Sequence, residues 1–283
     1  MNTYKSNVDI FNQELTLPER VFRPVNRCNI PPTVLGSLQF QYHPKTIVID
    51  GVHILHKALF LRLENCQQAQ QRAEIFMNYM AVHFRLYQLE DAGWDKDNAQ
   101  HRSKVDYRRM LRGWLFDTNS REGAVLKCWV ESRFGLVTRF HHESLKQEEQ
   151  YHSFQQLGAQ GLYGTNALEA QLDLLYSYCQ YELAKRFTDN DSLCLYRGIN
   201  HVDFYEVLKQ TDANHATILL NNLNSFSSDL ERADEFGDQI LSCQVPWQKI
   251  LFYSNLLPGL LAGENEHLVI GGVYDIVITQ VFP

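Results

Sequence analysis

Apolar residues recur at three- and four-residue steps in several long segments of the first two-thirds of the chain. This period matches one face of a helix, so each segment predicts an amphipathic helix. The predicted helices lie within residues 66–90, 104–117 and 166–187. Asn166 is expected to cap the last of them, with Glu169 three residues later as its capping-box partner.

After about residue 190 the pattern changes to short β-rich runs that are bounded by Gly, Pro, Asn and Ser. Strands are expected within 192–199, 215–228, 245–254, 267–272 and 274–282. One helix interrupts them, with Ser228 or Asp229 as its cap. The apolar stripe of this helix is expected to consist of Leu230, Ala233, Phe236 and Ile240.

The beginning of the chain carries prolines that interrupt regular structure, so its first twenty-odd residues are expected to form an arm. A short strand is expected at Thr46–Ile49, before the break at Asp50 and Gly51. The overall pattern predicts an α+β protein. A mainly helical region, 1–185, is expected to pack on a β-rich region, 186–283.

Composition narrows the class of protein. The 283 residues are 45% hydrophobic and 21% charged, as in a folded globular protein, and the formal net charge of −7 argues against nucleic acid as the partner. No signal peptide is visible, and no stretch approaches the roughly 20 apolar residues of a membrane helix. The six cysteines show no C-x-x-C spacing and are expected to be reduced thiols. A cytoplasmic protein without membrane insertion is therefore predicted.

Several motifs that would assign a chemistry are absent. The sequence has no phosphate-binding G-x-x-x-x-G-K-[ST] or G-x-G-x-x-G motif and no G-x-S-x-G nucleophile elbow. The histidine pairs lack a third ligand nearby, and acidic triplets such as 189–191 are typical of solvated loops. No bound metal is predicted.

Three features in the β-rich region carry candidate chemistry. Arg197 ends an apolar run and precedes Gly198, so its guanidinium is placed to bind a diphosphate while glycine lets a ligand approach the backbone. Ser225 and Ser227 share one face of a strand end, with Phe226 on the other.

The third feature is the sequence E-N-E, in which Glu264 and Glu266 precede an apolar run. If this segment is a strand, both carboxylates point the same way, at a cost in free energy unless a cation or a reaction uses them. Each of the three features also has an ordinary explanation. An arginine before a turn, serines that cap a helix and acids at a solvated strand entrance are common in proteins.

Taken in order, the three features resemble the Arg-Ser-Glu class of mono-ADP-ribosyltransferases. The spacing between Ala233 and Phe236 after the serines is also similar to that class, and Glu-x-Glu resembles its arginine-modifying branch. The stretches "NRCNIPPTVLGSLQFQYHP", "LYRGIN", "NNLNSFSSDLERADEFGD" and "ENEHLVIGGVYDI" resemble the bacterial dinitrogenase reductase ADP-ribosyltransferase family, and this resemblance covers nearly the whole chain. This resemblance implies an ADP-ribosyltransferase-like β core and an enzyme that modifies an arginine of the nitrogenase iron protein, switching off nitrogen fixation.

The resemblance also implies roles for the residues. NAD⁺ is the co-substrate. Glu266 acts on its nicotinamide ribose, Glu264 orients the acceptor arginine, and Ser225 holds Glu266. The implied NAD⁺-binding residues are Arg197, Gly198, Ser225, Phe226 and Ser227. The segment 255–263 is expected to be the loop that recognises the target, with Pro258, Gly259 and Gly263 shaping it.

Arg197 and Ser225 lie closer in sequence than in many toxins of the class. Part of the nicotinamide-side wall is therefore expected to come from the helical region. Two alternatives remain open: hydrolysis of NAD⁺ with water as the acceptor, and a regulator with weak catalysis that acts by binding its partner. The resemblance suggests dinitrogenase reductase as the protein substrate and a PII signalling protein as activator.

Overall fold

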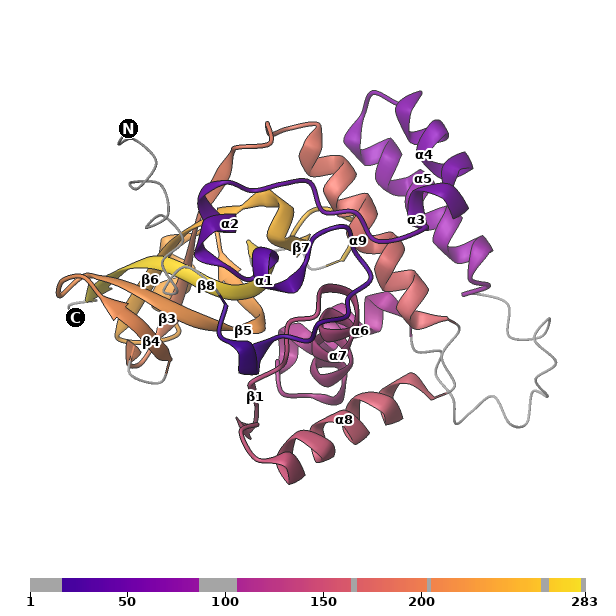
Figure 1. Ribbon diagram of the computed structural model, residues 1–283. Coiled ribbons are helices and arrows are strands. Elements are labelled where there is room, and N and C mark those ends of the chain that lie inside the picture. Colours follow the sequence, from indigo (N-terminus) through magenta and orange to yellow (C-terminus); the bar gives the residue numbers. More distant parts are fainter. Residues whose placement is uncertain (1–16, 87–105, 164–166, 203–204, 261–264, 281–283) are drawn as a thin grey trace, which may run out of the picture.

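The computed structural model describes residues 17–86, 106–163, 167–202, 205–260 and 265–280. Figure 1 shows a helical part on one side of the molecule and a strongly twisted sheet on the other. In the described ranges, nine helices precede the main sheet in sequence, and one short helix lies within the β-rich region. The predicted α+β class is confirmed.

The helices of the described residues vary widely in length. They are α1 (Pro32–Leu35), α2 (Leu38–Tyr42), α3 (Val52–Leu55), α4 (Lys57–Glu64), α5 (Ala69–His83), α6 (Tyr107–Phe116), α7 (Arg121–Phe134), α8 (Glu148–Leu162), α9 (Leu168–Ala184) and α10 (Leu230–Asp234). Short 3-10 turns occupy Glu19–Val21 and Trp247–Lys249.

Within the described residues, the six strands of the main sheet all lie after residue 190, in the region predicted to be β-rich. They are β3 (Ser192–Ile199), β4 (Glu206–Gln210), β5 (His215–Ser227), β6 (Gln239–Pro246), β7 (Ile250–Tyr253) and β8 (Glu266–Gln280). The strands at Glu206–Gln210 and over most of Gln239–Pro246 were not predicted, and a 3-10 turn at Trp247–Lys249 divides the run predicted at 245–254. The order is β4-β5-β3-β6-β8-β7, every pairing is antiparallel, and β5 also pairs with β8. The additional pairing closes β3, β6, β8 and β5 into a ring. A separate two-stranded ribbon joins β1 (Phe140–His141) and β2 (Glu143–Ser144).

Strand β8 corrects the expectation of two separate runs at 267–272 and 274–282. It is one continuous strand, and two adjacent glycines lie inside it rather than ending it. A Cβ at Gly271 would collide with the carbonyl oxygen of Asn221, where β5 bulges, and Gly272 has a φ of +119°. The glycines therefore let β8 pass close to the bulge of its neighbour.

The long predicted helices are confirmed as α5, α6 and α9. The predicted start of α9 is corrected in part: Asn166 lies outside the described residues, and Ala167 occupies the cap position without a side-chain hydrogen bond. Glu169 forms an ion pair with Arg133 of α7 at 3.1 Å. This carboxylate therefore joins two helices.

The strand predicted at Thr46–Ile49 is wrong. The segment is extended but pairs only through an isolated bridge between Ile49 and Cys28. The side chain of Asn29 donates to the carbonyl of Thr46 and accepts from the amide of Val48. The side chain of Asn29 thus satisfies two backbone groups of this segment.

The described part of the predicted N-terminal arm packs against the body of the protein. Leu17 and Val21 are buried, and the amide of Arg23 donates to the carbonyl of Gly135 at 2.7 Å. Proline begins a helix here as well, because Pro32 is the first residue of α1. The described part of the predicted arm therefore belongs to the folded body of the protein.

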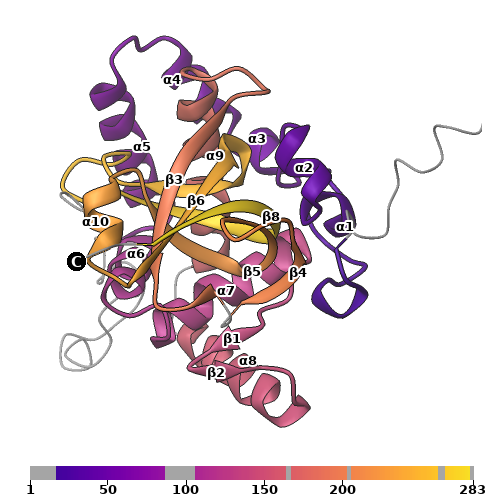
Figure 2. The same ribbon diagram turned by 90° about the vertical axis from the view of Figure 1, so that its left-hand side faces the viewer.

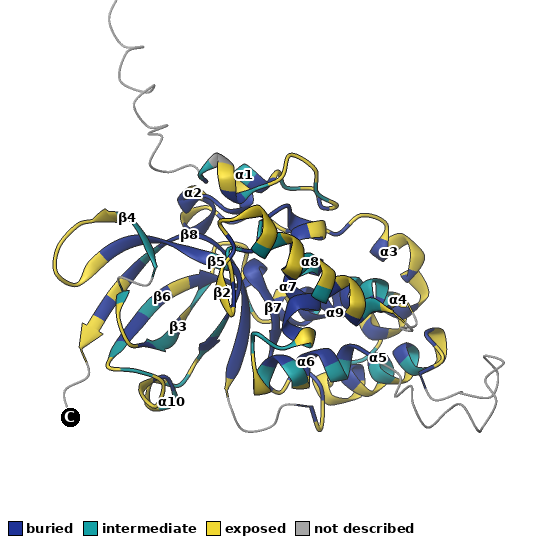
Figure 3. Cartoon of the chain, turned by 90° about the horizontal axis from the view of Figure 1, so that it is seen from below, coloured by how far each residue is buried: buried dark blue, intermediate teal, exposed yellow. Residues whose placement is uncertain are grey.

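One continuous hydrophobic core extends through both the helical and the β-rich regions. Helix α9 packs on β7, and α2 packs on β6 and β8. Figure 3 shows that α9 and β5 are buried along most of their length. Helix α10 instead lies beside β3 at the margin of the sheet (Figure 2). The division at residues 185 and 186 stays a prediction.

Candidate active site

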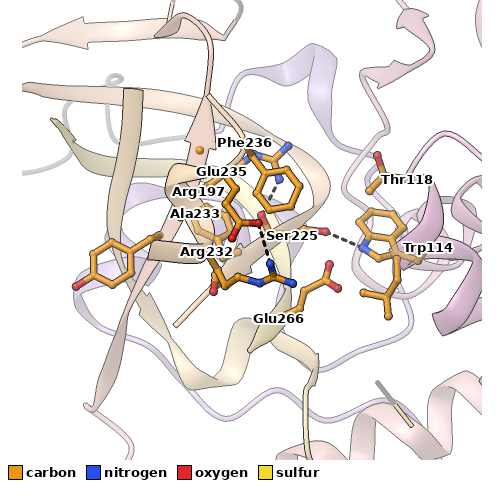
Figure 4. A pocket seen from close by; sticks show the side chains of 14 residues that line it. Trp114, Thr118, Arg197, Ser225, Arg232, Ala233, Glu235, Phe236 and Glu266 are labelled. Atoms are coloured by element: carbon orange, nitrogen blue, oxygen red, sulfur yellow. Dashed lines mark hydrogen bonds and ion pairs between the residues drawn. The ribbon is translucent and has the colours of Figure 1, made fainter. Parts of the chain in front are cut away.

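A pocket with an empty volume of about 930 Å³ opens between the sheet and the helical region. Its walls come from α6 and the turn after it, from β3, β5 and β8, and from α10 with the residues that follow (Figure 4). The lining residues are Trp114, Leu115, Thr118, Tyr196, Arg197, Gly198, Ser225, Phe226, Ser227, Arg232, Ala233, Glu235, Phe236 and Glu266. Candidate residues that are far apart in the sequence thus meet in one place.

Six of the seven predicted site residues line this pocket: Arg197, Gly198, Ser225, Phe226, Ser227 and Glu266. The seventh, Glu264, lies outside the described residues. The ring of β-strand pairings brings the motifs together, because Ser227 pairs with Tyr196 of β3 on one side and Glu266 of β8 on the other. The roles of these residues stay predictions.

Arg197 is held by contacts on its own side of the pocket. Its Nε donates to the hydroxyl of Tyr205 at 3.0 Å, and its Nη1 donates to the backbone carbonyl of Ser225 at 2.6 Å. Both acceptors are neutral, so the positive charge of the guanidinium is not compensated by them. An oriented cation at the wall of an open pocket is suited to an anionic ligand.

Gly198 has a packing role in addition to the predicted one. A Cβ at this position would collide with the carbonyl oxygen of Ala233 and meet the Cβ of Phe236 at 3.0 Å. The glycine therefore lets the α10 segment pack against β3, and its predicted contact with a ligand stays a prediction. This contact explains the Ala233–Phe236 spacing: Ala233 is buried against the strand, while the Phe236 ring is 70% exposed and lines the pocket.

Helix α10 is shorter than predicted, and its expected apolar stripe is wrong. Asp229 is the cap, as one of the two alternatives proposed, with its side chain accepting from the amide of Glu231. Only Ala233 of the stripe is buried on this helix, since Leu230 and Phe236 are exposed and Ile240 belongs to β6. The helix is a short connection between strands.

The serine pair alternates along β5 as predicted. Phe226 is buried, whereas the neighbouring serines are partly exposed on the pocket side. The Oγ of Ser227 accepts from the amide of Asp229 at 3.0 Å, which fixes the turn into α10. The Oγ of Ser225 accepts from the indole Nε1 of Trp114 at 2.8 Å. Ser225 is thus bonded to the helical region, a contact that the sequence did not predict.

Glu266 is the first residue of β8 and is only 9% exposed. Its backbone is held at both ends by Ser254: the amide of Glu266 donates to Ser254 Oγ at 2.9 Å, and its carbonyl accepts from the Ser254 amide at 2.8 Å. Figure 4 shows the carboxylate of Glu266 between the sheet residues and Trp114. A fixed carboxylate therefore faces the open space of the pocket.

The expected shared strand face of the two glutamates involves Glu264, which lies outside the described residues. Strand β8 begins at Glu266, and the preceding Asn265 has a left-handed backbone with φ of +48°. The carbonyl of Asn265 accepts from the amide of Ser228 at 3.1 Å, which joins the approach to β8 to the serine turn.

The described part of the predicted recognition loop, 255–260, is anchored by leucines. Leu256, Leu257 and Leu260 are buried, whereas Pro258 and Gly259 are exposed. Gly259 has a φ of +71°, which favours glycine at the exposed tip. Gly263 lies outside the described residues.

A buried lysine lies behind the pocket wall. The Nζ of Lys127 is 5.7 Å from the centre of the Trp114 ring and donates to the carbonyl of Phe140 at 3.2 Å. Burial and, to a smaller extent, the nearby positive charge of Arg197 lower the pKa of Lys127 to about 7. The neighbouring His141 is also buried, and its pKa falls to about 4. Local charge behind Trp114 is therefore kept low.

Sequence reasoning missed the individual residues of the helical wall. Trp114, Leu115 and Thr118 lie in or just after a predicted amphipathic helix, where an aromatic residue ordinarily indicates core packing. The expectation that the helical region supplies part of the wall is confirmed. The exposed ion pair of Arg232 and Glu235 at the rim was also missed.

The pocket combines a cation, aromatic rings and a carboxylate. Such a set can bind a ligand that is anionic at one end and develops positive charge at the other. The described residues hold no cluster of three or more side chains suited to a metal ion, and all six cysteines are free thiols. None of the helices in the described ranges has the length and apolar character to cross a membrane.

Comparisons with known proteins identify the family. Residues 25–278 match dinitrogenase reductase ADP-ribosyltransferase (DRAT). The chain is 38% identical over 254 residues to the NAD(+)–dinitrogen-reductase ADP-D-ribosyltransferase of Rhodospirillum rubrum, covering 88% of this chain and 92% of the relative. No solved structure matches the chain significantly. The chain therefore belongs to the dinitrogenase reductase ADP-ribosyltransferase family.

Proposed function

We propose that this protein transfers ADP-ribose from NAD⁺ to an arginine side chain of dinitrogenase reductase. Membership of the family and the name of the R. rubrum relative support the reaction and the target. The observation that carries the proposal is the meeting of Arg197, Ser225 and Glu266 in one pocket. These residues stand on three different strands, in the order that the Arg-Ser-Glu class requires.

NAD⁺ would bind with its diphosphate on Arg197, whose fork of donors suits phosphate oxygens. Tyr205 and the carbonyl of Ser225 already orient that guanidinium. The exposed Phe236 ring at the pocket wall supplies apolar surface for a ring of the dinucleotide.

Glu266 would supply the electrostatic part of the reaction. Nicotinamide leaves with the electron pair of its bond to the ribose, and positive charge develops on the sugar. A carboxylate already fixed beside that charge stabilises it without reorganising. Ser254 holds the backbone of Glu266 in place, which supports this role.

The acceptor arginine must lose a proton as one of its nitrogens bonds to the ribose carbon. Guanidinium is protonated at neutral pH, so a base is needed at the acceptor side. By family resemblance this base is Glu264. Glu264 lies outside the described residues, and its role rests on the sequence.

The direct test uses NAD⁺ labelled in the adenylate part, purified dinitrogenase reductase and mass mapping of the product. The proposal predicts label on one arginine of the target, with one nicotinamide released for each ADP-ribose transferred. Nicotinamide release that is unaffected by the target, with no label on protein, would instead identify a glycohydrolase. Absence of both products would leave a regulator that acts by binding.

Glu264→Gln sharpens the distinction between transfer and hydrolysis. Water needs no deprotonation of a guanidinium, so slow NAD⁺ hydrolysis should persist while transfer to the target falls. Glu266→Gln should suppress both reactions together, since both pass through charge on the ribose. Equal loss of the two reactions in Glu264→Gln would contradict the division of tasks.

Two further proposals rest on resemblance and sequence alone. We infer a PII signalling protein as activator, to be tested by transfer assays with and without purified PII protein. We also infer a cytoplasmic location, to be tested by fractionating cells that produce the tagged chain.

A further inference from the structure

Trp114 belongs to none of the three motifs, yet it contacts the serine of the second one. It lies 111 residues before Ser225, and its indole Nε1 donates to Ser225 Oγ at 2.8 Å (Figure 4). Its side chain is 1% exposed, so the bond is shielded from competing water. The contact links the helical region directly to the centre of the site.

The chemistry of the two groups gives this bond a direction. An indole N–H can only donate, whereas a serine hydroxyl accepts through its lone pairs and donates its own proton. Ser225 must therefore accept from Trp114. Its own proton is then directed away from the tryptophan.

The strand register places Ser225 close to Glu266. Ser225 pairs with Leu268 in the β5–β8 ladder, and Ser227 pairs with Glu266. Ser225 and Glu266 are therefore diagonal neighbours on one face, a separation that a long side chain can span. Both residues line the pocket, so the serine hydroxyl and the carboxylate share this space.

The position of Ser225 is fixed from a second direction. Its backbone carbonyl accepts from Arg197 Nη1 at 2.6 Å, on the side of the site proposed for the diphosphate. Ser225 thus joins the anion-binding arginine to the helical wall. Any shift of the indole would change the geometry of both.

We infer that Trp114 is a positioning residue for the transfer reaction. It holds Ser225 as an acceptor, so that the serine donates toward Glu266 and keeps the carboxylate aligned with the ribose of NAD⁺. The inference rests on the proposed function and adds to it a residue outside the Arg-Ser-Glu motifs.

Trp114→Phe removes the N–H and keeps an aromatic ring. We expect kcat for transfer to fall on the order of 10-fold, because small misplacements of a catalytic group are costly, while KM for NAD⁺ changes less than about threefold. Trp129→Phe is the matched control. Trp129 is also 1% exposed and donates at 2.8 Å, but to Asp173 and outside the pocket lining.

A double-mutant cycle tests whether the effect passes through Ser225. In a Ser225→Ala background, Trp114→Phe should have little further effect on kcat. Independent, multiplying effects would overturn the inference, as would unchanged kcat in Trp114→Phe or equal kcat losses in Trp114→Phe and Trp129→Phe. If Trp114→Phe does not fold, 3-benzothienylalanine at position 114 replaces the N–H by sulfur with the shape preserved, and the same outcomes apply.

Wild-type transfer to dinitrogenase reductase is measured first. Its absence would refute the proposed function, whereas normal wild-type transfer with unaffected variants would refute only the role of Trp114.

Discussion

The two sides of the pocket are held in different ways. On the sheet side, the guanidinium of Arg197 donates to a hydroxyl and a backbone carbonyl, Ser254 holds the backbone of Glu266, and both Arg197 and Glu266 line the pocket. On the helical side, Trp114 is buried, and its outward contact is one hydrogen bond. The sheet side presents reactive groups, whereas the helical side fixes their orientation.

The helical region owes its own rigidity to buried ion pairs. Arg72 of α5 binds Glu182 of α9 with two hydrogen bonds of 2.7 Å, and both side chains are buried. Arg133 of α7 binds Asp173 of α9 in a similar way. The comparison predicts that substitutions in these pairs change stability, while substitutions on the sheet side change catalysis.

Breaking the buried pair should have the largest effect on folding. Arg72→Met leaves the Glu182 carboxylate buried without its guanidinium, and we expect a loss of about 3–5 kcal/mol in the free energy of unfolding. Chemical denaturation measures this loss. Adding Glu182→Met should recover much of it. A loss below about 1 kcal/mol in Arg72→Met would contradict the assigned role of the pair.

Glu266→Gln should instead impair catalysis and leave the stability of the fold nearly unchanged. We expect transfer to fall on the order of 10²-fold or more, because electrostatic stabilisation of the ribose is lost, with little change in NAD⁺ affinity or melting temperature. Single-turnover transfer and NAD⁺ titration measure these effects. Glu231→Gln on the exposed side of α10 is the control and should transfer normally. Near-normal turnover in Glu266→Gln would exclude this carboxylate.

Gly198→Ala tests the contact between β3 and α10. The added methyl would collide with the carbonyl of Ala233, so we expect a loss of about 1–3 kcal/mol in stability. NAD⁺ affinity should weaken as well, because Phe236 moves with the segment. Cys194→Ala, at an exposed position of the same strand, should be nearly neutral in both measurements. Equal behaviour of the two variants would refute the packing explanation.

Lys249 offers a smaller, pH-dependent effect. It is fully buried, its Nζ lies 4.3 Å from the centre of the Tyr274 ring, and it makes no hydrogen bond to any residue in the described ranges. Burial lowers its pKa to about 7. Between pH 7 and the ordinary pKa of a lysine, Lys249 carries its proton in the unfolded chain but not in the folded protein. The free energy of unfolding should therefore rise with pH, by up to about 1.4 kcal/mol per pH unit.

Lys249→Met removes this contribution. Its slope of stability against pH between 7 and 9 should be lower than that of the wild type, and it should be more stable at pH 7. Guanidinium denaturation at several pH values gives both quantities. Identical slopes would show that Lys249 remains charged in the folded protein.

Local periodicity predicted those elements that local sequence determines. The helices α5, α6 and α9 and the strands β3 and β5 carry continuous patterns and were predicted near their observed positions. The errors lie where a distant partner decides the structure. Thr46–Ile49 lacks a neighbouring strand, β8 continues through its glycines because β5 bulges beside them, and Ile240 joins β6 because β3 pairs with it.

The candidate site also combines residues that the local sequence predicts with contacts that depend on distant partners. The order of the motifs located Arg197, Ser225 and Glu266. Few residue types can bind a diphosphate or stabilise a positive charge, so these residues could be recognised in the sequence. The bond from Trp114 depends on how α6 packs on β5, which periodicity does not specify. The shared face predicted for Glu264 and Glu266 stays a prediction, because Glu264 lies outside the described residues.

The most direct test of the account is a crystal structure of Glu266→Gln with NAD⁺ bound, since this variant should bind the dinucleotide without consuming it. The account predicts the diphosphate on the guanidinium of Arg197 and the nicotinamide ribose within hydrogen-bond distance of residue 266, between Trp114 and Phe236. NAD⁺ bound elsewhere, or with its ribose turned away from residue 266, would contradict it.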